Sequence, residues 1–562
     1  MARRESIRAL ASRWRDVEYP ALTATRFMAF ARTGDRVTWE RPCFDRRKKL
    51  IAAALGVCEG GDDADLDAAV DGIWLISEET SWVISAHNGE TPGAPLPDPE
   101  TPYLDLFSAQ TGMILSLCCG LLCDQLDAVS PLIRRRVGRE VERRVLTPFE
   151  ARSDFWWMGY TRKDLNNWTP WIVSNVMLCA CAWVEDVERL RAILERGMKM
   201  LDRWLAVVPD DGGCDEGAGY WSMAGGALLD CLDLLERVTG GRMALWGDAK
   251  LDNILRYPLN AWLGGDWFVN FADCDARPDI PGERLMFAGR RTGDAVLTAF
   301  GARFMGAPAA QLDDTPQLWR LLNMLFSPDV DAGEAAPPED VWLGDLQQRL
   351  VRRGRMALAV KGGVNCGGHS HNDCGGFILT VEGAPQIVDA GNMTYTARTF
   401  SDARYTLWNT RSMYHNVPLI GGFEQENGPS RGARDVAYLP DGLSLDIAGA
   451  YPDAAGVLAC IRTVALRDGA CVVRDRIVTE RPAPIVETFL LRERPDWDGR
   501  VLTAGSIRIE PPPGMAVEIK EIPITDPRMA KSFPGSLWRV AFGAPAAVEH
   551  DLQFRIVRVN EE

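Results

Sequence analysis

Three of the five histidines in the chain lie close together, at His369, His371 and His415. His369 and His371 are two positions apart, so on an extended strand both imidazoles project to the same face, where they could share a metal ion or divide metal binding and proton transfer between them. Asp389 ends the next apolar run, QIVD. Two or three histidines with one carboxylate are a common set of zinc ligands. The cluster therefore indicates a metal site, a proton-transfer site, or both.

The alternative is that these residues are hydrogen-bonded polar groups at the edge of a strand, the commoner role of a single histidine. Glycines on both sides of the pair favour a functional site, because they let the backbone approach a ligand closely. These glycines are Gly367, Gly368, Gly375 and Gly376. Of the two remaining histidines, His87 taken alone would be structural, and His550 is expected at the surface.

The chain before about residue 325 has the apolar spacing of helices. In VEDVERLRAILERGMKMLDRWL, Val187, Leu190, Leu194 and Leu201 fall on one helical face. GALLDCLDLLERVTGG predicts a helix that stops at its final glycines, and TGMILSLCCGLLCDQL predicts a buried helix. We expect residues 1–326 to form an all-helical domain.

The segment 327–342 is rich in Pro, Asp and Ala and lacks periodicity, so we expect a linker there. Beyond it the apolar residues alternate in short runs such as FILTVEG and LQFRIVRV. Asp468-Gly469 lies between two β-branched runs, the strongest short signal for a hairpin. Residues 343–562 should therefore form an antiparallel β-sandwich, giving a multidomain α+β protein.

Composition narrows the classes of partner. With 562 residues the chain should hold two or more domains. The formal charge of -16 argues against nucleic-acid binding, and no run is apolar enough to span a membrane. The 14 cysteines lack a disulfide-framework spacing and the start lacks a signal-like apolar run, so we expect a cytoplasmic protein, or a periplasmic or secreted one if the sequence has been trimmed. The 19 tryptophans suit sugar stacking or helical cores.

Longer segments carry a family resemblance. HSHNDCGGFILTVEGAPQIVDAGNMTYTARTF, continuing to RYTLWNTRSMYHNVPLIGG, resembles the signature region of heparinase II/III-like polysaccharide lyases, and EETSWVISAHN, NNWTPWIVSN and DDGGCDEGAGYW also look like family segments. The resemblance implies an N-terminal (α/α) toroid and a C-terminal antiparallel β-sandwich. It also implies cleavage of uronic-acid-containing glycans, of glycosaminoglycan or alginate type, by β-elimination that leaves unsaturated uronate ends.

The resemblance implies one divalent metal, usually zinc, with manganese or calcium as alternatives. Carried over by position, its ligands are His371, Asp389 and His415, and its role is mainly to brace loops rather than to activate water. The expected substrate is an acidic oligo- or polysaccharide, and a homo-oligomer is a further possibility. A cytosolic location would favour short imported oligosaccharides and exo-type cleavage.

The same carry-over assigns roles at the reacting carbon. Tyr220 and His369 match the proton-transfer pair, and Asn166 or Asn167 matches the amide that neutralises the uronate carboxylate. His87 is a further catalytic candidate. The expected substrate-binding residues are Asn88 in the cleft wall, Trp168 and Trp171 for stacking, and Trp221. Arg162, Arg404 and Arg411 are expected to lower the tyrosine pKa and to grip carboxylates or sulfates.

Two other functions fit parts of the pattern. A glycoside hydrolase on an (α/α) toroid would use Asp210 or Asp211 with Asp215 or Glu216, and would leave the histidine cluster without a role. A non-catalytic, metal-stabilised glycan-binding protein would tolerate substitution of Tyr220 and His369. An unsaturated product distinguishes the lyase from both.

Overall fold

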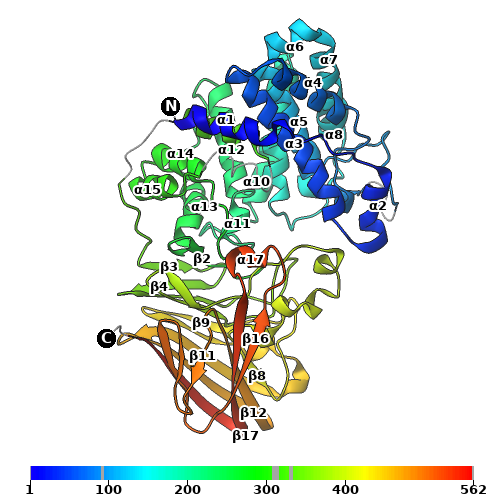
Figure 1. Cartoon of the computed structure of the whole chain (residues 1–562). Coiled ribbons are helices and arrows are strands. Elements are labelled where there is room, and N and C mark those ends of the chain that lie inside the picture. The colour runs from blue at the N-terminus through cyan, green and yellow to red at the C-terminus, as the bar shows by residue number, and fades with distance from the viewer. Residues whose placement is uncertain (1, 90–93, 307–315, 328–332, 560–562) are drawn as a thin grey trace. The chain divides into compact units, whose positions relative to one another are not determined.

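The computed structural model describes residues 2–89, 94–306, 316–327 and 333–559. By their contacts these residues group into two compact units (Figure 1). The helical unit comprises Met1–Val208, Ser222–Asp248 and Pro281–Ala335, and the β unit comprises Pro209–Trp221, Ala249–Ile280 and Ala336–Glu562. The predicted α+β class is confirmed, with helices in the N-terminal part and a large antiparallel sheet in the C-terminal part.

The helical unit is built from helices that pack in neighbouring pairs, such as α5 with α9 and α3 with α4. An added Cβ at Gly112 of α5 would lie 3.1 Å from the Cys179 sulfur of α9, so the glycine permits this close packing. The helices of the unit are α1 Ala2–Arg15, α2 Ala24–Thr33, α3 Val37–Cys58, α4 Asp63–Ser77, α5 Leu106–Leu121, α6 Cys123–Val129, α7 Pro131–Val141, α8 Thr147–Ala151, α9 Trp168–Trp183, α10 Val187–Leu205, α12 Gly225–Val238, α14 Gly282–Thr292, α15 Ala295–Arg303 and α16 Leu318–Phe326.

In the described part of the chain no single helix has the length and hydropathy of a membrane span. The bent pair α5 and α6 meets that test jointly, with an angle of 83° between its halves. Most of α5 is buried against other helices of the unit, as expected of a core helix.

The β unit holds a 15-stranded antiparallel sheet and a separate two-stranded one. Its elements are α11 Ala218–Trp221, α13 Ala249–Asn260, β1 Trp262–Gly264, β2 Trp267–Phe268, β3 Asp340–Leu343, β4 Gln348–Arg353, β5 Met356–Lys361, β6 Phe377–Val381, β7 Ala384–Ile387, β8 Pro418–Ile420, β9 Arg434–Leu439, β10 Gly442–Asp446, β11 Val457–Arg467, β12 Ala470–Leu491, β13 Asp496–Trp497, β14 Leu502–Ala504, β15 Ile507–Glu510, β16 Ala516–Pro523, α17 Met529–Ser532 and β17 Ser536–Arg558. The predicted hairpin is confirmed, since Arg467 pairs with Ala470 across Asp468 and Gly469, which both have positive φ.

The units divide the chain differently from the expected domains. Strand β3 begins at Asp340, inside the predicted linker 327–342, of which 328–332 lie outside the described residues. Residues 209–221 and 249–280 belong to the β unit although the surrounding sequence is helical. Periodicity predicts the type of an element but not the core it packs against, and these two segments carry much of the site described below.

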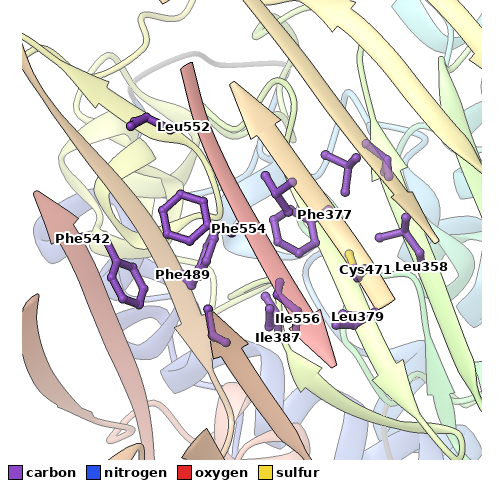
Figure 2. Packing of buried hydrophobic residues seen from close by; sticks show 14 of the residues in the cluster. Leu358, Phe377, Leu379, Ile387, Cys471, Phe489, Phe542, Leu552, Phe554 and Ile556 are labelled. Atoms are coloured by element: carbon purple, nitrogen blue, oxygen red, sulfur yellow. The ribbon is translucent and has the colours of Figure 1, made fainter. Parts of the chain in front are cut away.

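The β core is a layer of interlocking aromatic and aliphatic side chains (Figure 2). The Phe489 ring centroid lies 5.1 Å from that of Phe554 and 5.8 Å from those of Phe542 and Phe377, with edge-to-face orientations. These residues come from β6, β12 and β17, so the core joins strands that are far apart in the sequence.

A charged cluster is enclosed in the sandwich. Arg462 on β11 lies 3.2 Å from carboxylate oxygens of Asp475 and Glu487 on β12, and all three side chains are fully buried. Burial, and then the charge of Asp475, raise the pKa of Glu487 well above its ordinary value. One guanidinium faces two carboxyl groups, so folding favours the protonated form of Glu487.

Glu487→Gln is expected to raise Tm at about pH 8 and to have less effect at about pH 5. A carboxyl whose pKa is raised by folding stabilises the native state below its unfolded pKa, and that stability is lost as the pH rises towards the folded pKa. Glutamine resembles the protonated form and avoids the loss, which we place at about 1–3 kcal/mol. Calorimetry at both pH values checks this, with the exposed Glu549→Gln as control. Destabilisation at the higher pH would contradict it.

Candidate active site

Two tyrosines of the β unit share a short hydrogen bond. The Tyr220 hydroxyl, on α11, donates to the Tyr395 hydroxyl at 2.6 Å. The Tyr395 oxygen also accepts from the Asn392 amide at 3.4 Å and lies 3.3 Å from Nδ1 of His369. The predicted pair Tyr220 and His369 therefore lies within one unit, with Tyr395 between them.

Two glycines allow these segments to meet. Gly217, just before α11, has φ 83°, and a Cβ there would lie 2.6 Å from the Cys274 side chain. Gly391, in the loop after β7, has φ 62°, and a Cβ there would lie 2.4 Å from the Cys274 carbonyl oxygen. Both positions combine a left-handed backbone with a close approach, so a larger residue would push the tyrosine loops away from the segment around Cys274.

Burial raises the pKa of Tyr220 above its ordinary value. The positive charge of Arg528 and the hydrogen bond to Tyr395 act in the opposite direction, while Glu216 and Asp273 raise the pKa further. Burial likewise raises the pKa of Tyr395. A tyrosine here becomes a base only if nearby donors and cations stabilise its phenolate.

Asp273 contacts three other charged or titratable side chains of the site. Its carboxylate lies 3.1 Å from Nδ1 of His369 and 3.0 Å from Nε2 of His371, and it accepts from the Arg404 guanidinium at 2.8 Å. Burial alone would raise the pKa of Asp273, but the hydrogen bonds from His369 and His371, the charge of His371 and the bond from Arg404 hold it well below its usual range. The ionised carboxylate orients both rings of the His-x-His motif.

Glu216 lies on the other side of His369, with a carboxylate oxygen 3.9 Å from Nε2. Burial raises the pKa of Glu216 to about 7, opposed by the charge of His369 and increased by Asp215 and Asp273. Burial lowers the pKa of His369, but the hydrogen bond with Asp273 and the charge of Glu216 outweigh it, so the net shift is upward. His369 is thus suited to hold a proton near neutral pH.

A second cluster begins at His371, two positions after His369 in the sequence. Nitrogen and oxygen atoms of His371, Asp373, Asp389 and His415 all lie within 4.8 Å of one another, and all four residues are buried. The three predicted ligands are thus brought together, and Asp373 joins them. The Lys361 ammonium pairs with one oxygen of Asp373 at 2.7 Å.

Three atoms of this cluster point to a cation. His371 uses Nε2 for Asp273. Its Nδ1 is buried and has no hydrogen-bond partner among the described residues, and the same holds for one oxygen of Asp373. His415 places Nε2 2.9 Å from the Asn409 carbonyl, so a neutral His415 directs its Nδ1 lone pair at Asp389, 3.0 Å away. A lone pair directed at a carboxylate is repulsive, and a cation between these acceptors would remove that repulsion. The donor set therefore fits a closed, four-ligand zinc site.

His415→Ala is expected to abolish metal binding and to lower the free energy of unfolding by about 2–5 kcal/mol, because it removes a buried ligand and leaves Asp389 unpaired. Mass-spectrometric metal analysis, and Tm with and without a chelator, measure both effects. His550→Ala serves as control, since Nε2 of His550 contacts only backbone carbonyls among its described hydrogen bonds. A chelator-insensitive wild-type Tm would contradict the prediction.

The helical unit holds a separate group of predicted residues. Nδ1 of His87 lies 2.9 Å from the Asp105 carboxylate, which also caps α5, so Nε2 is left to face other groups. The His87 ring lies against Trp168, with centroids 4.7 Å apart. The Asn166 side-chain oxygen accepts from the Trp168 backbone N–H at 3.1 Å, and Asn166 is half-buried whereas Asn167 is buried.

Some residues that were predicted to bind substrate make contacts inside the protein instead. Arg404 is buried, and its nitrogens donate to Asp273 and to the backbone carbonyls of Ser370 and Thr399, so it orients Asp273 rather than gripping substrate. Trp171 is 7% exposed and Trp221 1% exposed, which corrects their expected role in substrate binding because neither offers a free face to a sugar.

The remaining predicted substrate-binding residues, Asn88, Arg162, Arg411 and Trp168, are half-buried or exposed. The Asn88 amide donates to the carbonyls of Ala94 and Leu96. Arg162 pairs with Asp164 and lies over Trp156, and Arg411 pairs with Glu424. Trp168 is half-buried and retains partial exposure for stacking.

Sequence reasoning missed Asp273, Tyr395, Asp373 and Arg528 as site residues. Two of them stood inside quoted motifs, as the tyrosine of Thr-Tyr-Thr and the aspartate of His-Asn-Asp, and could have been singled out. Asp273, in FADCDA, and Arg528, in TDPRMA, carry no comparable local signal.

Comparison with known proteins identifies one family model and several similar folds. The family model "Heparinase II/III-like, C-terminal" matches residues 336–496. Among solved structures, a heparinase III has a TM-score of 0.66 at 12% identity, covering 99% of this chain and 90% of its own. A heparan sulfate lyase HepC from Pedobacter heparinus has a TM-score of 0.62 at 14% identity, covering 94% and 77%. No curated protein sequence matches the chain. Residues 336–496 therefore match the heparinase II/III-like C-terminal model, and the solved structures, at 12–14% identity, show a similar fold over most of the chain.

Proposed function

We propose that the protein is a polysaccharide lyase that cleaves uronate-containing glycans of the glycosaminoglycan type by β-elimination. The observation that carries the proposal is the Tyr220–Tyr395 hydroxyl pair beside His369 and its carboxylate Asp273. Solved structures of similar fold that are named heparinase III and heparan sulfate lyase support the same class of reaction.

The elimination requires a base and an acid. The bond between carbon 5 and its hydrogen breaks, a double bond forms between carbons 4 and 5, and the bond from carbon 4 to the glycosidic oxygen breaks. The base keeps the proton from carbon 5, and the departing oxygen receives one from the acid. We assign the base to Tyr220 and the acid to His369, whose protonated form is favoured by the neighbouring carboxylates of Asp273 and Glu216.

The tyrosine pair suits the role of base. When one proton leaves two hydroxyls 2.6 Å apart, the other is shared, so the negative charge spreads over both oxygens. The Asn392 amide donates to the Tyr395 oxygen at 3.4 Å, and Nδ1 of His369 lies 3.3 Å from the same oxygen. Such donors offset the burial that opposes ionisation.

The bound uronate carboxylate must also be neutralised for the carbon 5 proton to become acidic. We assign this to Asn166 rather than Asn167, because the Asn166 oxygen is held by the Trp168 N–H, which leaves its amide N–H groups to donate, and because Asn166 is less buried. Nε2 of His87 is proposed to contact the same substrate region.

Asn166→Ala is therefore expected to lower kcat by about 10²–10³. Asn167→Ala is the matched control and should change kcat less while lowering Tm more, since Asn167 is buried. Steady-state kinetics with thermal melts separate the two. A larger kcat loss in Asn167→Ala would reverse the assignment.

We also propose zinc at His371, Asp373, Asp389 and His415. Bound there, zinc would supply structural bracing, because it would join the segment before β6, which carries His371 and Asp373, to the loops after β7 and before β8. Two imidazoles in the set favour zinc over calcium, which prefers oxygen ligands.

The glycoside hydrolase alternative is poorly supported by its carboxylates. Asp210 is exposed and pairs with Lys250 at 2.9 Å. Both oxygens of Asp211 accept backbone N–H groups, from Gly213 and Asp345. Glu216 is buried against His369, where it serves the proton-transfer group.

The deciding experiment offers the purified protein a panel of hyaluronan, chondroitin, heparan and alginate oligosaccharides. Ultraviolet absorbance follows the conjugated carbon 4–carbon 5 double bond, and a reducing-end assay runs in parallel. Rising absorbance with a glycosaminoglycan supports the proposal. Rising absorbance with alginate alone would change the assigned substrate class from glycosaminoglycans to alginate. New reducing ends without absorbance would establish hydrolysis and overturn the lyase assignment.

A further inference from the structure

The loop between β16 and β17 brings a cation to the tyrosine pair. Arg528 lies just before α17, with its guanidinium carbon 5.3 Å from the centre of the Tyr395 ring. The same guanidinium makes a forked ion pair with Asp275, with N–O distances of 2.9–3.2 Å. Planar forks of this kind hold an arginine in one orientation.

The loop is fastened to the segment that carries Tyr395. The Asp526 carboxylate accepts from the backbone N–H of Thr394 at 3.1 Å, and also from those of Arg528 and Met529 at 3.0 Å. Met529 and Phe533 are buried in a small cluster with residues before and after the active-site loops. The position of Arg528 is therefore determined by the same contacts that place Tyr395.

The charges that face the tyrosine pair make this cation important. Glu216 and Asp273 are both close enough to oppose ionisation of Tyr220, and Arg404 is engaged by Asp273. His369 contacts the Tyr395 oxygen but is shared with Asp273. Arg528, paired with Asp275, is the positive group that acts most strongly on Tyr220.

We infer that Arg528 is a positioning residue for the proposed elimination, holding the Tyr395 ring and stabilising the ionised Tyr220–Tyr395 pair. The inference rests on the proposed function for its role in turnover. It assigns part of the active site to a segment, 524–533, that lies outside the residues matched by the family model.

Arg277 offers a matched control. It pairs with Asp266 at 3.2 Å and lies 5.4 Å from the Trp267 ring centre, so it has the same two kinds of partner as Arg528 without a tyrosine pair. Arg528→Met is expected to lower kcat roughly 10- to 100-fold, leave KM within about threefold, and shift the rising limb of the kcat–pH profile to higher pH. Arg528→Lys should restore part of kcat, and Arg277→Met should stay within about twofold of wild type.

A substrate-free measurement separates this inference from the lyase proposal. Trifluorotyrosine at position 220, which ionises at lower pH than tyrosine, is titrated by fluorine NMR in the full chain. Arg528→Met should raise its ionisation pH and Arg277→Met should not. An unshifted titration, or a fall in kcat with an unchanged pH profile, would overturn the inference. A shifted titration in a protein without lyase activity would support the effect of Arg528 on tyrosine ionisation and would refute the proposed function.

Discussion

Tyr220→Phe is expected to lower kcat for β-elimination by about 10³-fold or more, while KM changes by less than about threefold. Phenylalanine preserves the ring and removes only the hydroxyl that donates to Tyr395 at 2.6 Å. The base is then lost, and Tyr395 alone lacks the partner with which it shares charge. Initial rates from the ultraviolet absorbance of the unsaturated product measure the effect.

Tyr451→Phe is the control for this substitution. Tyr451 is also buried, and its hydroxyl donates to the Pro418 carbonyl within the sandwich core. It should lose about 1 kcal/mol of stability and keep wild-type kcat. Retention of more than a tenth of the wild-type kcat in Tyr220→Phe would remove the tyrosine from the mechanism.

Asp273→Asn is expected to lower kcat by about 10²–10³ and to weaken metal binding by about 10–100-fold. The amide is nearly isosteric, but it removes the negative charge that orients His369 and His371 and pairs with Arg404. It would leave the Arg404 guanidinium buried without its anion. Because one carboxylate contacts both clusters, the two losses should occur in the same variant.

Kinetics and a competition assay with a chromogenic zinc chelator measure the two effects. Asp266→Asn is the matched control, since Asp266 pairs with an exposed arginine, Arg277, in the same unit. It should leave both quantities unchanged. Loss of metal with full turnover would show that Asp273 serves only the metal cluster, and loss of turnover with full metal affinity would show the reverse.

Local patterns in the sequence were sufficient for several features. The helical and β-rich parts follow from apolar periods that involve near neighbours only. The hairpin at Asp468-Gly469 forms because two adjacent residues adopt positive φ. The segment that carries the family resemblance contains His371, Asp389 and His415, three of the four residues of the buried His/Asp cluster, since strands and short loops bring them together within one stretch of chain.

Only the tertiary structure decided how the residues around Tyr220 and His369 come together. Asp273 meets His369 across 96 residues of sequence, Tyr220 meets Tyr395 across 175, and Arg528 meets Asp275 across 253. No local spacing specifies such pairs, because they depend on which core a segment packs into and on the glycines that permit close approach. For the same reason Arg404, expected at the substrate, is committed to Asp273: the pairing of a buried charge is settled by its three-dimensional neighbours.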